Sequence, residues 1–395
     1  VLLEYAAGDP RFVCREEEEE AWPAGEWAAY DRRVTPSAVG MGLLAQAMAA
    51  RRLLESPLAR DRYLGGVLVE AMRNKVASLA ELRGAPGSSN GLLAHAYAVT
   101  WKDHRLVYTV VEPRMELYDQ LALMWGLAGF IEFAECVPSS WPNALGALAG
   151  DASCARAELD RILRGISESL RGSDGALRES TADTAGSRVR TTTLGLLLAA
   201  LRRVSSVVGS EPAVERLATH AAIQLSGRVG LDGRLDSTGT ETGATDASAA
   251  VRGLLAASRI LSVSTYGAVA VRVLEAFDRD FWNGAVGAYL GTPGERRARL
   301  CVTPLDLGLL VGALLDASAI LPPVAAANLL SRLASHLRVL VRGAALHLAT
   351  ALPHDEAGSS LGGGAVPLAP ANVADAPLGW AFVFRDRVCY SEARP

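Results

Sequence analysis

The sequence predicts an all-α protein, an (α/α)6-like toroid of helical hairpins with short β-hairpins in its loops. Long segments rich in alanine and leucine alternate with polar, glycine-rich loops, and four helix openings resemble one another, at Arg114, Arg190, Thr245 and Thr303. The last three openings lie about 55 to 58 residues apart. That spacing exceeds ankyrin and tetratricopeptide periods and suits a helical hairpin with a substantial loop. Functional residues are therefore expected where loops enter the helices.

Composition is compatible with one large helical domain. Half of the 395 residues are hydrophobic, and the net charge of −4 provides no electrostatic footprint for nucleic acid. No apolar run approaches the roughly 20 residues that span a bilayer, so no membrane span is expected. The chain starts at Val1 without a signal-like segment. We therefore expect a processed or partial product, whose compartment the sequence does not indicate.

The five cysteines include no C-x-x-C pair, which argues against zinc-ribbon or thioredoxin-type chemistry. Cys136 and Cys154 flank one loop and could form a disulfide in an oxidising compartment. Buried free thiols are the favoured interpretation.

Three segments are expected along the chain. Residues 1–34 form an extended lead-in, whose acidic run at 16–20 is interpreted as a solvated face. Residues 35–342 form the helical toroid. Residues 343–395 form a Gly/Pro-rich tail, with a terminal strand at 380–384 that packs on the toroid.

The toroid begins with Thr35 as an N-cap and Pro36 at the first helical position. Two helices, a loop and a β-hairpin are predicted next, at 37–54, 59–82, 84–91, and 94–100 paired with 106–111.

A helix over residues 115–136 follows, and Asp151 is expected to cap another that runs to residue 170. Further helices, reaching residue 341, are separated by loops at 171–188, 226–244 and 278–302. Leu-rich helices on both sides of each turn predict two concentric layers.

Several segments resemble, in order, the C-terminal domain of the YyaL / spermatogenesis-associated, thioredoxin-domain-containing proteins. That domain is similar to six-hairpin glycosidases and N-acylglucosamine epimerases. The segment YAVTWKDHRLVYTVVEPRMELYDQ places Leu117-Tyr118-Asp119 where the family has a Leu-Tyr-Asp motif. Other similar segments are RVRTTTLGLLLAAL at 188–201, the helix start at 245–249, FWNGAVGAYLGT at 281–292 with Thr303-Pro304 after it, and AFVFRDRVC at 381–389.

Departures from the family pattern concern polar motif positions. A His-Phe-Glu stretch is replaced by valine and by Glu112-Pro113-Arg114, a Trp-Asn pair by Thr193-Leu194, and a Ser-Gly-Asn stretch by residues 305–307. The family's thioredoxin-like domain is not in this sequence. The resemblance therefore implies a degenerate site, in which the packing residues of the fold are retained and the polar motif residues are largely replaced.

Sugar enzymes built on toroids need two opposed carboxylates or a histidine pair. Asp119, beside Tyr118, is the best candidate, because the resemblance places it on an inner helix. Its alternative is a buried, hydrogen-bonded aspartate. Asp246 is the second catalytic candidate, and helix capping is the favoured alternative for both Asp246 and Asp306.

Aromatic residues are the candidate ligand-binding groups. Tyr118, Trp101, Trp282 and Tyr289 could line the cavity and stack on a sugar, and the last three could equally be plugs that close the toroid.

No metal and no cofactor are expected. His220 and His336 lie within helices without a partner four residues away. Residues 354–356 form a solvated turn rather than a cluster. No dinucleotide, P-loop or nucleophile-elbow motif is present.

Three functions remain as hypotheses. The first is a degenerate, non-catalytic toroid that acts as a binding or structural subunit for a protein partner. The second is a carbohydrate-active enzyme, an epimerase or hydrolase with paired carboxylates. The third is a module that works with a separate thioredoxin-like protein.

Overall fold

The computed structural model describes residues 33–339 except 87–90, 103–104, 137–147, 173–174, 184–187, 210, 237–242, 292–299 and 303. It also describes the backbone of short strands in residues 7–31 and 388–390. In the N-terminal part, β1 (Ala7–Gly8) pairs with β4 (Tyr30–Asp31), and β2 (Phe12–Val13) pairs with β3 (Ala24–Gly25). The acidic run, residues 354–356 and the strand expected at 380–384 lie outside the described residues.

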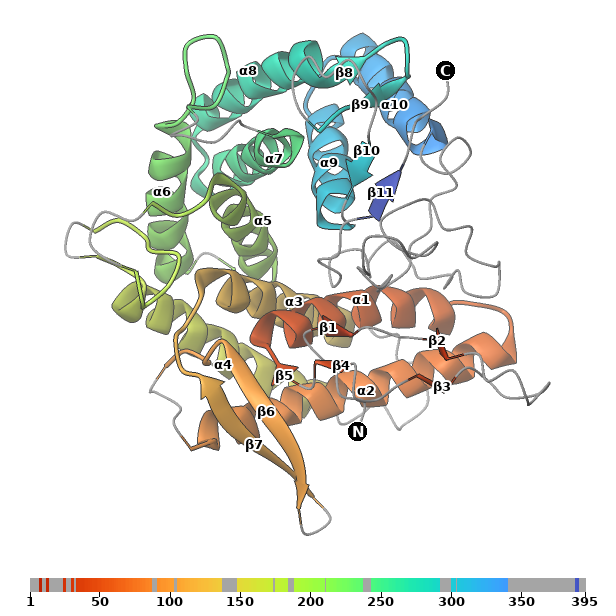
Figure 1. Cartoon of the computed structure of the whole chain (residues 1–395), viewed down its shortest axis with the longest axis vertical. Helices are drawn as coiled ribbons and strands as arrows, with labels where there is room; N and C mark the ends of the chain where they lie inside the picture. The colour runs from red at the N-terminus through yellow and green to blue at the C-terminus, as the bar shows by residue number, and fades with distance from the viewer. Residues whose placement is uncertain are drawn as a thin grey trace.

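Ten helices form five consecutive hairpins in the described part of the chain. Figure 1 shows them as two layers that curve around a common centre. The inner helices are α1 (Pro36–Leu54), α3 (Leu117–Glu135), α5 (Thr191–Val208), α7 (Ala244–Leu261) and α9 (Pro304–Ser318). The outer helices are α2 (Ala59–Gly84), α4 (Leu148–Ser169), α6 (Pro212–Ser226), α8 (Ser264–Phe281) and α10 (Pro323–Arg338). The predicted two-layer toroid is confirmed.

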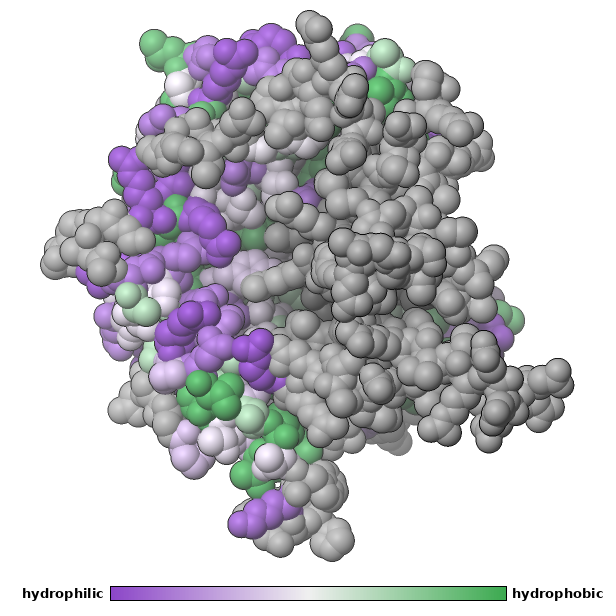
Figure 2. Space-filling view, viewed as in Figure 1, coloured by the Kyte–Doolittle hydropathy of each residue, from purple (hydrophilic) through white to green (hydrophobic). Residues whose placement is uncertain are grey.

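The inner helices are apolar on most sides because both faces are covered. In α3, sixteen of nineteen residues are buried, among them Phe130 and Leu123. The outer helices instead bury one stripe, and Figure 2 shows mainly hydrophilic residues over them along the left of that view. Burial of the Ala/Leu faces between the layers is the main stabilising contribution to this fold.

Glycines allow the inner helices to approach closely. A Cβ atom on Gly126 would lie 2.0 Å from the carbonyl oxygen of Gly40, at the contact between α3 and α1. The same relationship holds between α5 and α7, where a Cβ on Gly195 would lie 2.2 Å from the carbonyl oxygen of Ala249. Backbone contacts of this kind leave no room for any side chain.

Predicted helix starts are partly confirmed. Thr35 caps α1 through its hydroxyl, which accepts from the Ala38 N–H at 3.2 Å, with Pro36 in the first turn. Asp151 is not a cap, because α4 begins at Leu148, and its carboxylate instead accepts from Arg73 Nε at 2.6 Å.

The predicted β-hairpin is present as β6 (Ala96–Lys102) and β7 (Arg105–Glu112). A third strand, β5 (Arg33–Val34), joins its edge and was not predicted. Two shorter ladders pair β8 (Trp282–Asn283) with β9 (Ala288–Tyr289), and β10 (Leu300–Val302) with β11 (Val388–Tyr390). The last ladder joins residues 388–390 to residues 300–302, whereas the predicted packing of a strand at 380–384 stays a prediction.

Cys136 and Cys154 are both free, so the disulfide alternative is wrong. Both thiols are exposed, which also corrects the expectation that they are buried. They sit at the end of α3 and near the start of α4, on either side of the 137–147 segment.

One helix among the described residues, α5, is long and apolar enough to cross a bilayer by length and composition alone. It packs between α3 and α7 within the inner layer (Figure 1). An inner helix covered on several sides is expected to be apolar for that reason.

Candidate functional site

The starts of the inner helices carry a polar rim. In three of these helices the third residue is an aspartate: Asp119 in α3, Asp246 in α7 and Asp306 in α9. Two of the three accept a hydrogen bond from a threonine of the preceding inner helix. Thr192 Oγ1 donates to Asp246 Oδ1 at 2.6 Å, and Thr245 Oγ1 donates to Asp306 Oδ1 at 2.5 Å.

These hydrogen bonds give Asp246 and Asp306 partners that the capping interpretation did not include. No side-chain cap is formed at Gly243, the N-cap of α7, and the carboxylates instead bind hydroxyl groups of the preceding inner helix. Negative charge in a first turn is still favourable for the helix dipole. The two aspartates hold α5, α7 and α9 in register at the rim.

Asp119 occupies the same helical position but has a different partner. His95 Nδ1 lies 2.6 Å from Asp119 Oδ2. The Asp119 residue is 0% exposed, and its Oδ1 atom has no hydrogen-bond partner among the described residues. The His95 side chain is 13% exposed. A buried carboxylate thus holds a histidine that reaches the surface of the rim.

The position of His95 is set by the buried side chain of Gln120. Gln120 Nε2 donates to the Leu93 carbonyl at 2.8 Å, and its Oε1 accepts from the Leu93 N–H at 3.3 Å. The His95 N–H then donates to the Arg114 carbonyl at 2.7 Å. Both ends of the β6–β7 hairpin are therefore fixed against the start of α3.

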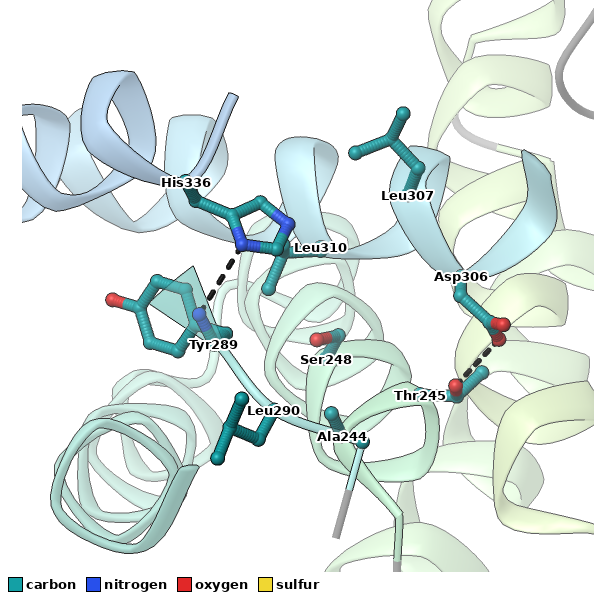
Figure 3. A pocket seen from close by; sticks show the side chains of 10 residues that line it. Ala244, Thr245, Ser248, Tyr289, Leu290, Asp306, Leu307, Leu310 and His336 are labelled. Carbon is teal, nitrogen blue, oxygen red and sulfur yellow. Dashed lines mark hydrogen bonds between the residues drawn. The ribbon is translucent and has the colours of Figure 1, made fainter. Parts of the chain in front are cut away.

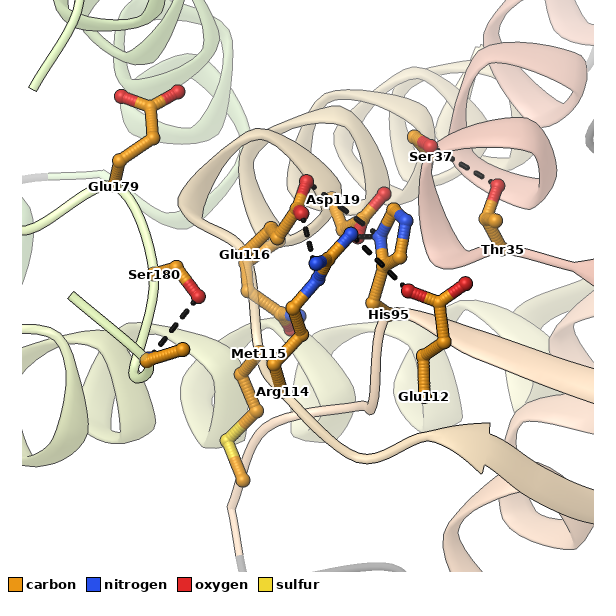
Figure 4. A network of polar contacts seen from close by, with 12 residues as sticks. Thr35, Ser37, His95, Glu112, Arg114, Met115, Glu116, Asp119, Glu179 and Ser180 are labelled. Atoms are coloured by element: carbon orange, nitrogen blue, oxygen red, sulfur yellow. Dashed lines mark hydrogen bonds and ion pairs between the residues drawn. The ribbon is translucent and has the colours of Figure 1, made fainter.

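A chain of alternating charges continues from His95 along the rim (Figure 4). Glu116 Oε2 lies 3.5 Å from His95 Nδ1, and Glu116 Oε1 lies 3.1 Å from Arg114 Nε. Arg114 Nη2 is 3.1 Å from Glu112, which also accepts from Arg33 at 2.6 Å. The arrangement places the Glu116 carboxylate between the Arg114 guanidinium and the imidazole.

The 170–190 loop reinforces this end of α3. The Leu117 N–H donates to the Glu179 carbonyl at 2.8 Å, and Met115 exchanges backbone and side-chain bonds with Thr181. The Glu179 carboxylate accepts from the Thr193 hydroxyl at 2.6 Å at the start of α5. Figure 4 shows Glu179 and Ser180 on the far side of Glu116 from His95.

The hydrogen bond that His95 makes to the Asp119 carboxylate raises the pKa of the histidine above the ordinary value, and the charges of Asp119 and Glu116 act in the same direction. Burial of the ring opposes the increase but does not cancel it. With Nδ1 bound to Asp119, no described residue bonds Nε2. This is the arrangement of a general acid–base histidine oriented by a carboxylate.

The same three residues could also hold a metal ion. One ligand atom each from His95, Glu116 and Asp119 lies within 4.8 Å of the others. The separation of 2.6 Å between His95 Nδ1 and Asp119 Oδ2 is that of a direct hydrogen bond between the two side chains. Arg114 also places a positive charge beside Glu116. The absence of a metal stays a prediction.

A small pocket lies between the starts of α7 and α9 (Figure 3). Its volume is about 50 Å³, which suits one or two water molecules or a hydroxyl group. His336 Nδ1 accepts from the Tyr289 N–H at 3.2 Å, whereas His336 Nε2 and Ser248 Oγ are buried without a described partner. Burial lowers the pKa of His336 to about 4, so the imidazole is neutral.

Trp282 and Tyr289 pack together at the end of α8, away from His95. Tyr289 is buried, stacked on Phe277 at 4.8 Å between ring centroids, and Trp282 packs edge-on against it at 5.0 Å. The Tyr289 hydroxyl donates to Asp278 at 2.9 Å. The packing favours plugs over cavity walls for Trp282 and Tyr289, although Tyr289 also lines the small pocket.

Tyr118 is buried beside Asp119 in the first turn of α3. The side chain of Trp101 lies outside the described residues. Ligand binding by these residues stays a prediction.

The structure does not bring the two predicted catalytic residues into one pair. Asp119 binds His95, whereas Asp246 binds Thr192 at the start of α5. His95 was missed as a site residue. In the sequence nothing distinguishes it from the other five histidines. The α3 end of the rim is also more polar than the hypothesis of a degenerate site implies.

Comparisons with known proteins agree with the fold. No family model matches the sequence, and no curated protein matches it. A sugar epimerase from a ruminal bacterium is 12% identical, with 79% of this chain and 76% of that chain covered and a TM-score of 0.54.

Two further solved structures give the same result. Cellobiose 2-epimerase from Bacillus thermoamylovorans is 10% identical over 79% of this chain and 76% of that one, with a TM-score of 0.55. A D-mannose isomerase is 10% identical over 77% and 75%, with a TM-score of 0.51. These neighbours define the class of fold as the α/α toroid that sugar epimerases share, and at such identities they define nothing further.

Proposed function

We propose that this protein is a carbohydrate-active enzyme that moves a proton on a sugar carbon, as an epimerase or isomerase. The observation that carries the proposal is the hydrogen bond of 2.6 Å between His95 Nδ1 and the buried Asp119 carboxylate. It supports the enzyme alternative over a non-catalytic toroid, because neither packing nor helix capping calls for a charged pair here.

In the proposed reaction, Asp119 orients the imidazole and leaves Nε2 to face the substrate. The carbon next to the carbonyl of an open-chain sugar carries an acidic hydrogen. His95 Nε2 accepts this proton, and the C–H electron pair moves into the carbonyl to give an enediolate. Delivery of a proton from solvent to the other face of the same carbon, with the carbonyl re-formed, epimerises the sugar. Return of the His95 proton to the carbonyl carbon, with transfer of the adjacent hydroxyl proton to the former carbonyl oxygen, isomerises it.

The charges around His95 suit this role. The carboxylates of Asp119 and Glu116 stabilise the imidazolium that forms after proton transfer. Gln120 acts as a positioning residue, because it holds Leu93 two residues before the histidine.

Glycoside hydrolysis through paired carboxylates has less support. Both retaining and inverting mechanisms need two carboxyl groups that reach the glycosidic bond. Asp119 is completely buried and Asp246 is engaged by Thr192, so neither meets this requirement as it stands.

Solvent exchange tests the proposal whichever product the reaction forms. The protein is incubated in D2O with D-mannose or cellobiose, sugars that the structural neighbours are named for, and deuterium at the carbon next to the carbonyl is measured by NMR. We expect incorporation by the wild-type protein, and a decrease of at least about 100-fold in the His95→Gln variant. His220→Gln, which changes a histidine on the outer helix α6, is the matched control and keeps the wild-type rate.

Two results would contradict this proposal. One is an absence of exchange by the wild-type protein across a panel of aldoses and ketoses. The other is exchange that persists at the wild-type rate in His95→Gln.

A binding-subunit role is the second candidate. Large apolar side chains are exposed along the first half of α2, namely Tyr63, Leu64 and Val67, with Leu58 just before it. Such side chains on one helix favour a protein partner, including the expected thioredoxin-like one. If Tyr63→Ser and Val67→Ser leave capture of purified thioredoxin-like proteins unchanged, this role loses its support.

Kinship with the YyaL / spermatogenesis-associated proteins is a narrower proposal. Its support is that the similar segments coincide with the starts of inner helices, at Leu117 for α3, Thr191 for α5 and Ala244 for α7. The test is an alignment that contains this sequence, the YyaL / spermatogenesis-associated proteins and sequences intermediate between them. The proposal fails if no intermediate sequence aligns with both.

A further inference from the structure

A cluster of arginines lies inside the ring, away from the rim. Arg252 on α7 places its guanidinium carbon 5.0 Å from the ring centroid of Trp125 on α3, although α5 lies between these helices in the ring (Figure 1). Arg202 on α5 likewise reaches past α7 to Asp316 on α9, at 2.9 Å. Contacts that pass over an intervening helix are made within the ring, so these side chains face its interior.

The depth of the cluster follows from helix geometry. Trp125 and Arg252 are each six residues beyond the rim aspartates of their helices, Asp119 and Asp246. At 1.5 Å per residue they lie about 9 Å below the rim. Gly312 of α9 is at the same depth below Asp306, and a Cβ there would lie 2.6 Å from the Arg252 guanidinium carbon. The glycine leaves space for that guanidinium.

The positive charges of the cluster exceed its negative charges. Asp316 is shared by Arg202 at 2.9 Å, Arg252 at 3.5 Å and Arg259 at 3.9 Å. Arg203 pairs with Glu132 at 2.7 Å. Four guanidinium groups therefore share two carboxylates, which leaves two formal positive charges unbalanced among these residues.

Buried donors in the cluster have no hydrogen-bond acceptor. Among the described residues, Nε of Arg203 and both Nε and Nη1 of Arg252 are buried without one. Burial lowers the pKa of Arg252, and the charges of Arg202 and Arg203 act in the same direction, against the opposing effect of Asp316. Buried guanidinium groups that share so few acceptors are costly unless something supplies further negative charge.

Arg203 and Arg252 lie side by side. The Arg203 guanidinium carbon would be 3.8 Å from a Cβ on Gly129, and Arg252 covers Trp125. Positions 125 and 129 are four residues apart on α3, so they are neighbours on one face of that helix.

Access is from the side opposite the rim. The Arg252 side chain is 18% exposed, whereas Arg202 and Arg259, which lie nearer the helix C-termini, are 38% and 36% exposed. The C-terminal helix dipoles favour positive charge there, yet Arg202, Arg203 and Arg252 precede the last turns of their helices. The dipoles alone do not explain the cluster.

We propose that this cluster binds an oxyanion, the phosphate or carboxylate group of a small molecule, between Arg203 and Arg252. Guanidinium groups bind both kinds of anion through paired N–H donors. The proposal is independent of the chemistry at His95.

Thermal unfolding in the presence of defined anions tests this site. The full chain is heated in sodium phosphate, sodium acetate or sodium chloride at equal ionic strength. We expect a saturable rise in Tm, of about 2 °C or more, with phosphate or acetate and none with chloride. We expect this rise in Tm to be lost in Arg252→Met and also in Arg203→Met. If Arg252→Met does not fold, Arg203→Met still tests the site.

Arg73→Met is the matched control. Arg73 is a partly buried arginine on α2 that already has two carboxylate partners, Glu70 and Asp151, so it has no capacity for another anion. Its variant keeps the anion-dependent rise although its own Tm is lower. Comparison with this variant also removes the general stabilisation that phosphate gives by exclusion from protein surfaces.

The outcomes separate the possibilities. A rise with phosphate alone identifies a phosphate site, and a rise with acetate alone identifies a carboxylate site. A rise that persists in Arg252→Met and Arg203→Met indicates an adventitious ion only and overturns the proposal, as does the absence of any rise in the wild-type protein.

Discussion

His95 Nδ1 lies 2.6 Å from Oδ2 of Asp119, a carboxylate that is completely buried in the first turn of α3. The remaining Asp119 oxygen has no described hydrogen-bond partner, so the histidine is the main polar contact of this side chain. The pair couples the protonation of a rim histidine to the interior of the toroid.

Replacement of the carboxylate should change the titration of the histidine. Because the Asp119 hydrogen bond is the largest cause of the raised His95 pKa, Asp119→Asn should lower that pKa toward or below the ordinary value near 6.5. A titration of the imidazole signals by NMR measures it. An unchanged midpoint would mean that the pair is not formed in solution.

The same pair has a defined effect on stability. A raised pKa in the folded state stabilises the protein below the unfolded pKa, and this contribution is lost as pH rises through the folded pKa. The free energy of unfolding of the wild-type protein should therefore decrease relative to Asp119→Asn as pH increases above about 6.5. Urea denaturation at several pH values between about 6 and 9 provides the comparison.

His336 should have the opposite pH dependence. Burial lowers its pKa to about 4, so between about pH 6.5 and 4 the unfolded chain binds a proton that the folded protein does not. The free energy of unfolding should fall by about 3 kcal/mol as pH decreases through this window. His336→Asn, whose side-chain oxygen can accept from the Tyr289 N–H, should remove this component. Parallel pH profiles for the two proteins would contradict the prediction.

Contact between α1 and α3 should not tolerate a methyl group. In Gly126→Ala the new Cβ would lie 2.0 Å from the Gly40 carbonyl oxygen, so the helices must separate. We expect a loss of more than about 2 kcal/mol of unfolding free energy in chemical denaturation. Gly66→Ala on α2 is the matched control, because nothing lies within 4 Å of its Cβ, and it should be neutral or slightly stabilising.

Truncation of the inner layer should be costly at Phe130. Its side chain is fully buried in α3, and Phe130→Ala is expected to lower the unfolding free energy by about 3–5 kcal/mol. Leu231 is 93% exposed, and Leu231→Ala should change it by less than about 0.5 kcal/mol. Equal effects at both positions would argue against the described core.

Much of the fold could be predicted, because the periodicity of Ala/Leu segments is a local property of the chain. Thr35 and Pro36 mark the start of α1 correctly, and both hairpin strands were found. The start of α4 was missed, because Asp151 has the residue type of a cap but serves as a partner of Arg73 on another helix. Strand β5 was missed because two residues carry no pattern of their own.

Less of the candidate site could be predicted. Asp119 was found because it stands at a helix start, but residue type alone does not distinguish it from Asp246 and Asp306, whose partners are threonines of neighbouring helices. His95 gave no signal, since its partner is 24 residues away along the chain. Only the return of the β6–β7 hairpin to the start of α3 brings the two together.

Amino-acid order alone determined the repeated helical hairpins and their two layers. The reason is that the apolar stripe of a helix arises from the spacing of residues that are close together in the sequence. Tertiary structure decided which polar groups meet: His95 with Asp119 at the rim, and Arg252 with Trp125 inside the ring, 127 positions away in the chain. The reason is that the helices curve around a common centre, which places side chains from distant segments within a few ångströms.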